Sequence, residues 1–521
     1  MANQAVRSSG LAGVAAAAVA LGVSELVAVA FGPSADSRTA IGSTVIDLTP
    51  GPVKEWAIQI FGTNDKLMLT IAVLIVIAVI AAVAARFETR RSPVGSAVLA
   101  LAGVAGCAAV VSRAGASWAD IWPTVIGTIC GIAVLRLLVS RRVAGEERED
   151  TDAEETTDSV PNPTRRQSLV TIGFLTVGVV ASVTGSALLK LRSSVAGDRE
   201  AFVLPTAPAP PPPPPPALQP PGVKLPPFFT PNADFYRIDT ALSVPQLSRP
   251  QWRLRIHGMV DREISYGFDD LNRFEVIEKP VTLTCVSNPV GGELVGNAKW
   301  TGYRVSDLLA AAGVKPNSDM VLSTSIDGFT AGTPVEALTD DRESLLAIGM
   351  NGSPLPVEHG YPARLVVPGL YGYVSATKWV VDLELTRFDL AQGYWTPLGW
   401  SARGPIKTES RVDVPRSGQS VPRGAVTFGG VAWAQHVGVR GVEVHVEGPG
   451  QQDVWRPAQL GASYSKDCWR LWSFGWQATE PGSYEVSVRA TDETGATQTS
   501  QLADVLPNGA TGWHTVSFTV T

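Results

Sequence analysis

Cysteine and histidine are scarce in this chain of 521 residues, which contains 4 cysteines and 5 histidines. So few cysteines exclude the dense disulfide framework of small secreted domains. The sequence has no Cys-x-x-Cys-His run, which excludes covalent haem attachment of that type. All histidines follow residue 250, so a haem held between two histidines cannot lie in the part before it.

Charged residues are also few, because Asp, Glu, Lys and Arg make up 17% of the chain. The formal net charge is −6, which leaves no domain-wide basic surface to displace the counterions of a nucleic acid. We therefore expect no nucleic-acid partner. Apolar residues reach 45% and are concentrated before residue 190, so the chain is too hydrophobic to be soluble throughout.

Long apolar runs predict a membrane region over residues 1–190. A bilayer crossing needs about 20 residues. Five runs meet this length: Leu11–Phe31, Leu67–Ala85, Val94–Val111, Ile121–Val139 and Leu169–Leu189. We expect five transmembrane helices, with the two ends of the region on opposite sides of the membrane.

Cationic residues beside the runs predict the orientation, because cytoplasmic loops carry the excess of Lys and Arg. One assignment places ten of them in the cytoplasm: Arg7, Arg86, Arg90, Arg91, Arg136, Arg141, Arg142, Arg148, Arg165 and Arg166. The opposite loops carry Arg38, Lys54, Lys66 and Arg113. We therefore expect a multi-pass cell-membrane protein with a cytoplasmic N-terminus and everything after residue 190 outside the cytoplasm.

Two segments with many charged residues precede the fifth run. Residues 146–155 are almost entirely charged, and we expect no fixed structure there. Arg165 and Arg166 stand directly before the fifth run, where a twin arginine is either an export signal for folded proteins or a pair of cytoplasmic flank residues. Both interpretations remain open from the sequence.

Residues 191–227 form a proline-rich linker that includes the uninterrupted run Pro210–Pro216. Such a run favours polyproline II, which rises about 3.1 Å per residue. We expect a semi-rigid stalk that lifts the later domains off the membrane.

Residues 228–413 combine short strands with a few helices and predict an α+β domain. Ser306 as N-cap and Gly313 as the terminating residue bound one short helix. Strands separated by Gly and Pro turns are expected at Val281–Val286, Met320–Ser325, Ala363–Val367 and Trp379–Leu385.

Residues 414–521 lose the helical signal. Val442, Val444 and Val446 alternate with polar residues, which is typical of a half-buried strand. Tryptophans can fill the space between two sheets, and they stand at Trp433, Trp455, Trp469, Trp472 and Trp476. We expect an all-β, immunoglobulin-like sandwich.

Chemistry-bearing residues gather in the α+β domain. Cys285 ends an apolar strand pattern and precedes a Gly-rich loop, whereas His359, Arg364 and Lys378 follow within a hundred residues. Cys285 alone is as well explained as a buried strand residue, and it can also pair with Cys468. A thiolate suits a soft metal, and Arg with Lys suits a phosphate, so the set together indicates a metal held by an anionic cofactor.

These motifs resemble the molybdopterin-binding domain of the sulfite oxidase family. The resemblance rests on Thr284–Asn288, Gly296–Trp300, the His-Gly-x-Pro-x-Arg run His359–Arg364, and Lys378-Trp379. The C-terminal sandwich resembles that family's dimerisation domain, so the similarity extends from Phe228 to Thr521.

The resemblance implies a molybdenum–molybdopterin cofactor, with Cys285 as the thiolate ligand to the metal. It implies further cofactor contacts from Asn232, Tyr236, Arg237, Asn288, His359, Arg364, Ser375 and Lys378. One departure affects the substrate. Animal and plant sulfite oxidases follow the metal cysteine with Ala-Gly-Asn-Arg, whose arginine helps bind sulfite, whereas this chain has Val286–Pro289. We expect Arg411 and Arg470 to supply catalytic positive charge; Arg403 is a further candidate, and ordinary packing is the alternative for each.

The sequence thus predicts a membrane-anchored molybdenum oxidoreductase acting outside the cytoplasm. The expected reaction transfers an oxygen atom to or from a small sulfur oxyanion or sulfoxide, resembling methionine sulfoxide reduction more than sulfite oxidation. A separate redox partner is expected, and a homodimer is one alternative for the assembly. The competing hypothesis is an inactive, stalked scaffold that holds no cofactor.

Overall fold

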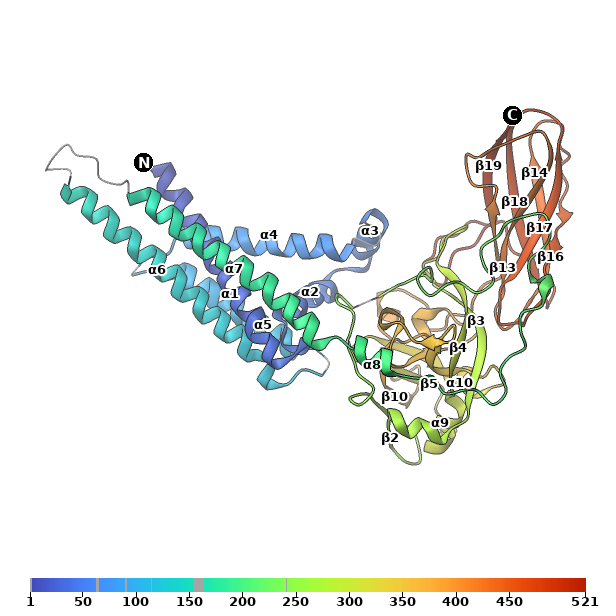
Figure 1. Cartoon of the computed structure of the whole chain (residues 1–521), viewed down its shortest axis with the longest axis horizontal. Helices are drawn as coiled ribbons and strands as arrows, with labels where there is room; N and C mark the ends of the chain where they lie inside the picture. Colours follow the sequence, from blue (N-terminus) through green and yellow to red (C-terminus); the bar gives the residue numbers. More distant parts are fainter. Residues whose placement is uncertain (1, 62–64, 90, 114, 153–162, 240) are drawn as a thin grey trace. The chain divides into compact units, whose positions relative to one another are not determined.

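The computed structural model describes residues 2–61, 65–89, 91–113, 115–152, 163–239 and 241–521 (Figure 1). The chain divides into two units, which are described separately. Unit one is Met1–Ser194 with Ala241–Ser243, and unit two is Val195–Thr240 with Val244–Thr521.

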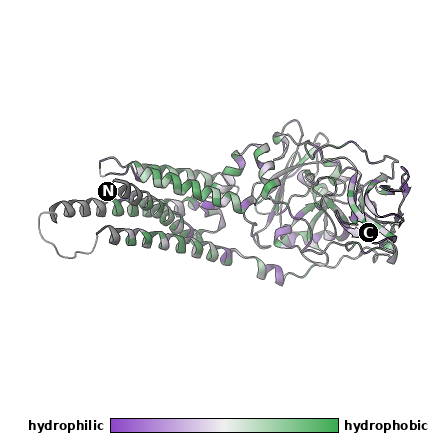
Figure 2. Cartoon of the chain, turned by 90° about the horizontal axis from the view of Figure 1, so that it is seen from above, coloured by the Kyte–Doolittle hydropathy of each residue, from purple (hydrophilic) through white to green (hydrophobic). Residues whose placement is uncertain are grey.

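Unit one is helical in its described part. Its helices are α1 (Ala2–Phe31), α2 (Ser37–Leu48), α3 (Gly51–Phe61), α4 (Asp65–Ala85), α5 (Val94–Val111), α6 (Trp122–Asp152) and α7 (Pro163–Ser193). Five helical stretches are long and apolar enough to cross a membrane: Ser9–Phe31, Lys66–Ala85, Val94–Val111, Trp118–Ser140 and Ser168–Ala201. Figure 2 shows hydrophobic residues along these helices. The five predicted apolar runs are therefore confirmed as helices.

Small residues let α1 approach its neighbours closely. A Cβ atom added at Gly22 would lie 2.2 Å from the carbonyl oxygen of Gly178 on α7, which leaves no room for a larger residue. Glu25 on α1 is buried, and its Oε1 lies 3.2 Å from Nε of Arg38. Ser182 and Ser186 donate to its other carboxylate oxygen. Glu25 is thus part of the polar packing of the bundle.

The structure corrects the prediction for the charged residues 146–155. Residues 146–152 continue α6, whereas residues 153–155 lie outside the described part of the chain. Extending an established helix is much easier than nucleating one, and Glu and Arg are good helix formers. The expectation of no fixed structure is therefore wrong for residues 146–152. Arg165 and Arg166 fall in the first turns of α7, and their role in export stays a prediction.

The proline-rich segment is also not a free stalk. Leu218 and Leu225 are buried in a cluster that includes Trp433 and Leu471. The Ala462 amide donates to the Ala217 carbonyl at 2.7 Å, so the segment lies on unit two. The stalk prediction is wrong because the apolar residues between the prolines pack against the C-terminal sandwich.

One mixed sheet, one antiparallel sheet and short helices form the α+β part of unit two. One sheet has the order β2 (Ile264–Gly267), β1 (Arg253–Gly258), β10 (Val380–Thr386), β5 (Met320–Ser325), β6 (Thr330–Pro334). The other has the order β3 (Val276–Thr284), β4 (Val295–Arg304), β7 (Leu345–Met350), β8 (Ser353–Pro354), with β9 (Arg364–Val366) beside β7. The short helices are α8 (Ala196–Ala201), α9 (Val305–Ala312) and α10 (Val335–Thr339). The four predicted strands correspond to β3, β5, β9 and β10.

The predicted helix is present as α9, but its start differs from the expectation. Arg304 occupies the N-cap position and makes no capping hydrogen bond with its side chain, so Ser306 is not the cap. Gly313 ends the helix in the left-handed conformation, with φ of 73°, as the sequence predicted.

The C-terminal part of unit two is a sandwich of two sheets. One sheet has the order β11 (Glu409–Val414), β13 (Gly424–Trp433), β17 (Arg470–Ala478), β16 (Gln459–Leu460). The other has the order β12 (Ser420–Val421), β19 (His514–Val520), β18 (Gly482–Asp492), β14 (Val439–Glu447), β15 (Arg456–Pro457). Trp472 and Trp476 lie in the core between the sheets, together with Val442, Val444 and Val446. The strand predicted from the alternation of these valines is therefore confirmed as β14.

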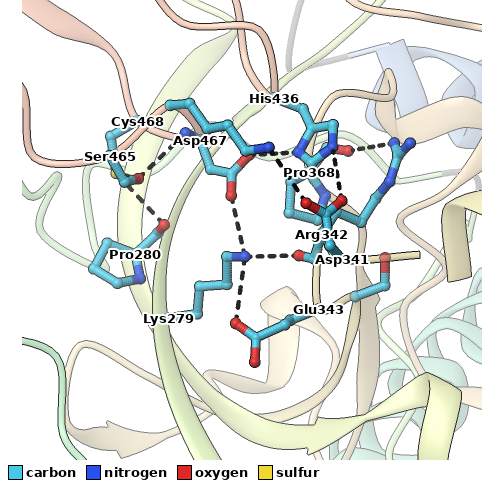
Figure 3. Close-up of polar contacts among 12 residues, drawn as sticks. Lys279, Pro280, Asp341, Arg342, Glu343, Pro368, His436, Ser465, Asp467 and Cys468 are labelled. Atoms are coloured by element: carbon cyan, nitrogen blue, oxygen red, sulfur yellow. Dashed lines mark hydrogen bonds and ion pairs between the residues drawn. The ribbon is translucent and has the colours of Figure 1, made fainter. Parts of the chain in front are cut away.

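A polar network joins the sandwich to the α+β part (Figure 3). Asp467, three residues before β17, is buried and lies 3.1 Å from Nζ of Lys279 on β3. Nδ1 of His436 lies 3.2 Å from the same carboxylate, and Lys279 also donates to the Arg342 carbonyl at 2.7 Å. The domain boundary predicted near residue 414 is therefore crossed by fixed contacts.

Candidate functional site

Cys285 stands where β3 ends and a tight loop begins. Its amide donates to the Leu294 carbonyl at 2.9 Å, and its carbonyl accepts from the Asn288 amide at 3.1 Å. Oδ1 of Asn288 accepts from the Leu294 amide at 2.8 Å, which closes the loop from within. The main chain on both sides of the thiol is therefore fixed.

The thiol of Cys285 is free, and the residue as a whole is only partly accessible to solvent. Burial raises its pKa, while hydrogen bonds with Ser287 act in the opposite direction. Such a thiol stays protonated at neutral pH unless a metal ion displaces the proton. The pairing with Cys468 is wrong, because both thiols are free and Sγ of Cys468 lies 3.4 Å from the Pro280 carbonyl oxygen.

Arg364, the first residue of β9, is a buried cation. Its guanidinium donates at 3.3 Å to the carbonyls of Leu365, His359 and Ala376, and it lies 5.1 Å from the ring centre of Trp300. Burial lowers its pKa to about 10. Within the described residues, no carboxylate forms an ion pair with it. A buried positive charge without a counter-ion is costly, so the site is built for an anion from outside the chain.

His359 lies beside Arg364 and is also buried. Its Nε2 lies 3.2 Å from the Asn232 carbonyl, and its ring meets Phe235 edge-on. Burial, followed by the charge of Arg364, lowers its pKa to about 4. The imidazole is therefore neutral at pH 7 in the cofactor-free protein and can donate or accept a hydrogen bond.

The charges of Cys285 and Arg364 both act on Tyr236. Its ring stacks on Phe235, with 5.2 Å between centroids and 21° between planes. Burial and then the charge of Cys285 raise its pKa, whereas Arg364 acts in the opposite direction. The structure thus brings Cys285, Tyr236, Arg364 and His359 into one electrostatic neighbourhood.

Lys378 and Arg237 share one buried counter-ion, Asp239. Lys378 also donates to the Glu358 carbonyl at 3.1 Å. These contacts place Lys378 against the loop that carries His359, while Arg237 is exposed. Their cofactor roles stay predictions.

Three polar residues predicted at the site have different surroundings. Asn232 donates to the Met350 carbonyl at 3.3 Å and accepts from Asn351 at 2.8 Å. The Ser375 hydroxyl donates to carbonyls of its own loop, including that of Tyr371 at 3.0 Å. Nδ2 of Asn288 is buried and has no hydrogen-bond partner in the described structure. A buried amide without a partner next to Cys285 fits a site that a polar ligand completes.

The arginines predicted to be catalytic are held by other groups. Arg411 on β11 pairs with Asp413 at 2.6 Å and donates to the Gly292 carbonyl at 2.8 Å, so it contacts the loop after Cys285. Arg470 donates to the carbonyls of Val439 at 2.9 Å and Gly461 at 2.7 Å, which are contacts within the sandwich. The exposed Arg403 pairs with Glu336 at 3.2 Å. The catalytic roles of Arg411 and Arg470 stay predictions.

Sequence reasoning missed two buried titratable residues, Tyr371 near the thiol and Glu409 near Tyr371. Burial raises the pKa of Tyr371, and Glu409 and Cys285 raise it further. Glu409 is buried at the start of β11, and burial raises its pKa to about 8 although Lys407 opposes this. Both residues depend on contacts between segments distant in sequence, and no local pattern marks either of them.

A second group of side chains has the composition of a metal site. Ligand atoms of Asp340, Asp341 and His436 lie within 4.8 Å of one another. However, Arg342 already binds Asp340 at 2.8 Å, and Lys466 lies 3.9 Å from Asp341. These cations already balance the carboxylates, so the group belongs to the polar network of Figure 3.

Comparison with known proteins decides the family. Residues 241–395 match the oxidoreductase molybdopterin binding domain. The uncharacterized oxidoreductase YuiH of Bacillus subtilis is 34% identical over 154 residues, which cover 30% of this chain and 74% of YuiH. The chain belongs to the sulfite oxidase family. It is therefore an oxidoreductase that binds a molybdenum–molybdopterin cofactor.

Other relatives are more distant. Human mitochondrial sulfite oxidase is 28% identical over 299 residues, which cover 49% of this chain and 54% of the human protein. The chain thus spans about half the length of this relative. Among solved structures, the sulfane dehydrogenase SoxCD from Paracoccus pantotrophus is similar with a TM-score of 0.47 and 24% identity. That match covers 55% of this chain and 80% of the SoxCD chain.

Proposed function

We propose that this sulfite oxidase family member is a membrane-anchored oxidoreductase. It transfers an oxygen atom to or from a small sulfur oxyanion or sulfoxide outside the cytoplasm. The observation that carries the proposal is the buried guanidinium of Arg364, which has no ion-pair partner in the described structure and shares a neighbourhood with the thiol of Cys285. A scaffold without a cofactor has no physical reason to keep such a charge buried.

The residues present fit the cofactor. Cys285 would supply sulfur to the metal, and Arg364 with Lys378 would hold the phosphate. His359, which is neutral, would hydrogen-bond the pterin, and the amide of Asn288 would gain the partner it lacks. When bound, the cofactor supplies two-electron oxygen-atom transfer. The chain itself fixes the thiol and excludes water around the cation.

A neutral sulfoxide fits the site better than sulfite. The loop Val286–Pro289 lacks the arginine that follows the metal cysteine in animal and plant sulfite oxidases. Arg411, which contacts this loop, is already neutralised by Asp413. An anion would therefore meet little free positive charge on this side. Methionine sulfoxide reduction is accordingly the preferred reaction within the proposal.

The proposal also covers the membrane region and the C-terminal sandwich. The five long apolar helices support anchoring by the region 1–190, and the loop charges support a cytoplasmic N-terminus. Residues 228–413 are assigned to cofactor binding. Residues 414–521 form the sandwich, which we assign to the immunoglobulin-like class because its two sheets pack around tryptophans. Its use in a homodimer and a separate redox partner complete the proposal.

Elemental and pterin analysis of the full chain, made in cells that synthesise the cofactor, tests the proposal directly. We expect about one molybdenum per chain and dye-linked turnover that is faster with sulfoxides plus a reduced dye than with sulfite plus an oxidised dye. Arg364→Met should lower cofactor affinity about ten- to hundredfold, because charge-assisted hydrogen bonds contribute roughly 1.5–3 kcal/mol. Arg387→Met, which removes an exposed arginine paired with Asp389, is the control. A folded chain without molybdenum would favour the scaffold.

A further inference from the structure

Unit one contains a cavity of about 220 Å³ between its helices. Its apolar wall includes Val73, Leu74 and Ile77 of α4, and its polar side includes Arg38 of α2 and Lys190 of α7. A space of this size holds one ring or one head group, and it is smaller than the roughly 300–1,000 Å³ of drug-sized sites. A combination of one hydrocarbon wall and one cationic side suits an amphiphile from the membrane.

The polar side of the cavity carries several N–H donors but little net positive charge. Nε of Arg38 lies 3.2 Å from the buried carboxylate of Glu25, and its Nη2 donates to Ser186 at 3.1 Å. Glu25 therefore compensates and orients Arg38. Lys190 has no ion pair in the described part of the chain, so about one positive charge remains. The Thr39 hydroxyl already donates to Asp36 at 2.7 Å and is not a further donor.

This balance distinguishes two ligand chemistries. A phosphate head group is best bound by several uncompensated cations. A carbonyl oxygen needs only N–H donors, and Arg38 and Lys190 provide them while the carboxylate of Glu25 keeps the local charge low. The geometry thus favours a neutral, ring-shaped head with carbonyl acceptors and an apolar tail.

We propose that this cavity binds the head of a lipid-soluble quinone, with its tail along α4. The inference rests on the proposed oxidoreductase function and names its electron partner. Leu242 and Ser243 also line the cavity.

The electron balance closes with a quinone as co-reactant. In the oxidising direction, a sulfur compound takes an oxygen atom from water and releases two electrons and two protons. The quinone takes up both electrons and both protons and leaves as the quinol. In the reducing direction, the quinol supplies the electrons and protons, and the sulfoxide oxygen leaves as water.

Photolabelling of the full chain in phosphatidylcholine nanodiscs tests the inference. The probe is an azido-substituted short-chain benzoquinone, and labelled peptides are identified by mass spectrometry. We expect labelling of α2, α4 and the end of α7, competed by excess unlabelled decyl-ubiquinone. Val73→Trp fills the cavity and should lower labelling at least fivefold, whereas Val79→Trp adds the same volume at an exposed position of the same helix and should not.

Lys190→Met should lower labelling because it removes the ammonium donor. Its control is Arg192→Met in the same turn, whose guanidinium donates to the Val29 carbonyl at 3.0 Å and which does not line the cavity. Labelling that ignores Val73→Trp, or that phosphatidylglycerol competes as well as the quinone, would overturn the inference. Molybdenum content and dye-linked turnover of the unsubstituted chain are measured in parallel. A chain that lacks molybdenum but is labelled refutes the proposed function alone, and an unlabelled active chain refutes the quinone site alone.

Discussion

At the scale of single residues, Cys285 has the most specific assigned role. Loss of its sulfur in Cys285→Ser should reduce dye-linked turnover by more than the roughly 10–100-fold that changes outside the metal ligands cost. Cys468→Ser is the matched control, because this second thiol is free and buried against Pro280, and it should keep turnover and molybdenum content. Equal activity of Cys285→Ser and the unsubstituted protein would contradict the ligand role.

The burial of His359 has a consequence for the dependence of stability on pH. Its pKa falls from 6.5 in the unfolded chain to about 4 in the fold, so the unfolded state binds more protons between these values. The stability that His359 contributes is complete above pH 6.5 and decreases as the pH falls towards 4. This contribution amounts to roughly 3 kcal/mol.

Denaturant unfolding of the cofactor-free protein at several pH values checks this expectation. His359→Gln keeps a polar side chain but cannot titrate, so its stability should change less between pH 6.5 and 4. Parallel curves for the two proteins would show that the imidazole titrates equally in the folded and unfolded states. The cofactor-bound protein should have a smaller slope than the free one, because an anion beside His359 favours its protonated form.

At the scale of elements, α9 depends on the glycine that terminates it. Gly313 has φ of 73°, and a Cβ added there would lie 2.9 Å from Cβ of Asp261. Gly313→Ala should therefore lower the free energy of unfolding of this region by about 1 kcal/mol or more. Gly197→Ala in α8 meets nothing within 4 Å and should instead be neutral or stabilising. Amide hydrogen exchange over α9 measures the difference.

The helices and strands also show which structural features can be predicted from the sequence and which cannot. The apolar runs of unit one and the alternation of Val442, Val444 and Val446 predicted helices and strands, because side-chain periodicity is a local property. The N-cap at Ser306 was wrong by two positions, since helix starts depend on how the preceding strand β4 leads into the helix. The stalk prediction was wrong because the burial of Leu218 and Leu225 depends on a surface made by residues more than 200 positions later, such as Trp433 and Leu471.

In the candidate site, too, some features could be predicted from the sequence and others could not. Cys285 and Arg364 were predicted from a spaced pattern of residue types, which resembles a family motif. The burial of Glu409 and its proximity to Tyr371 could not be predicted, because they arise where β11 meets a loop nearly forty residues earlier. Likewise, Arg411 was expected to supply positive charge to the site, with ordinary packing as the alternative, and only the fold shows that Asp413 pairs with it.

At the scale of the whole molecule, the polar network of Figure 3 holds the sandwich against the α+β part of unit two. Burial alone would raise the pKa of Asp467, but His436 and Lys279 reverse this and lower it. Lys279→Met removes one of these cations and leaves the carboxylate buried beside an apolar chain. We expect the junction to lose about 3 kcal/mol, because breaking a buried pair leaves an uncompensated charge.

Hydrogen exchange at β3 and β17 measures the opening of this junction without requiring two-state unfolding of the full chain. Arg255→Met is the control, since it breaks an exposed pair with Glu263 that should contribute less than about 1 kcal/mol. If Lys279→Met accelerates exchange no more than this control, the network does not stabilise the junction. A specific acceleration at both strands would show that the sandwich and the cofactor domain separate as one event, because Lys279 and Asp467 lie on opposite sides of that boundary.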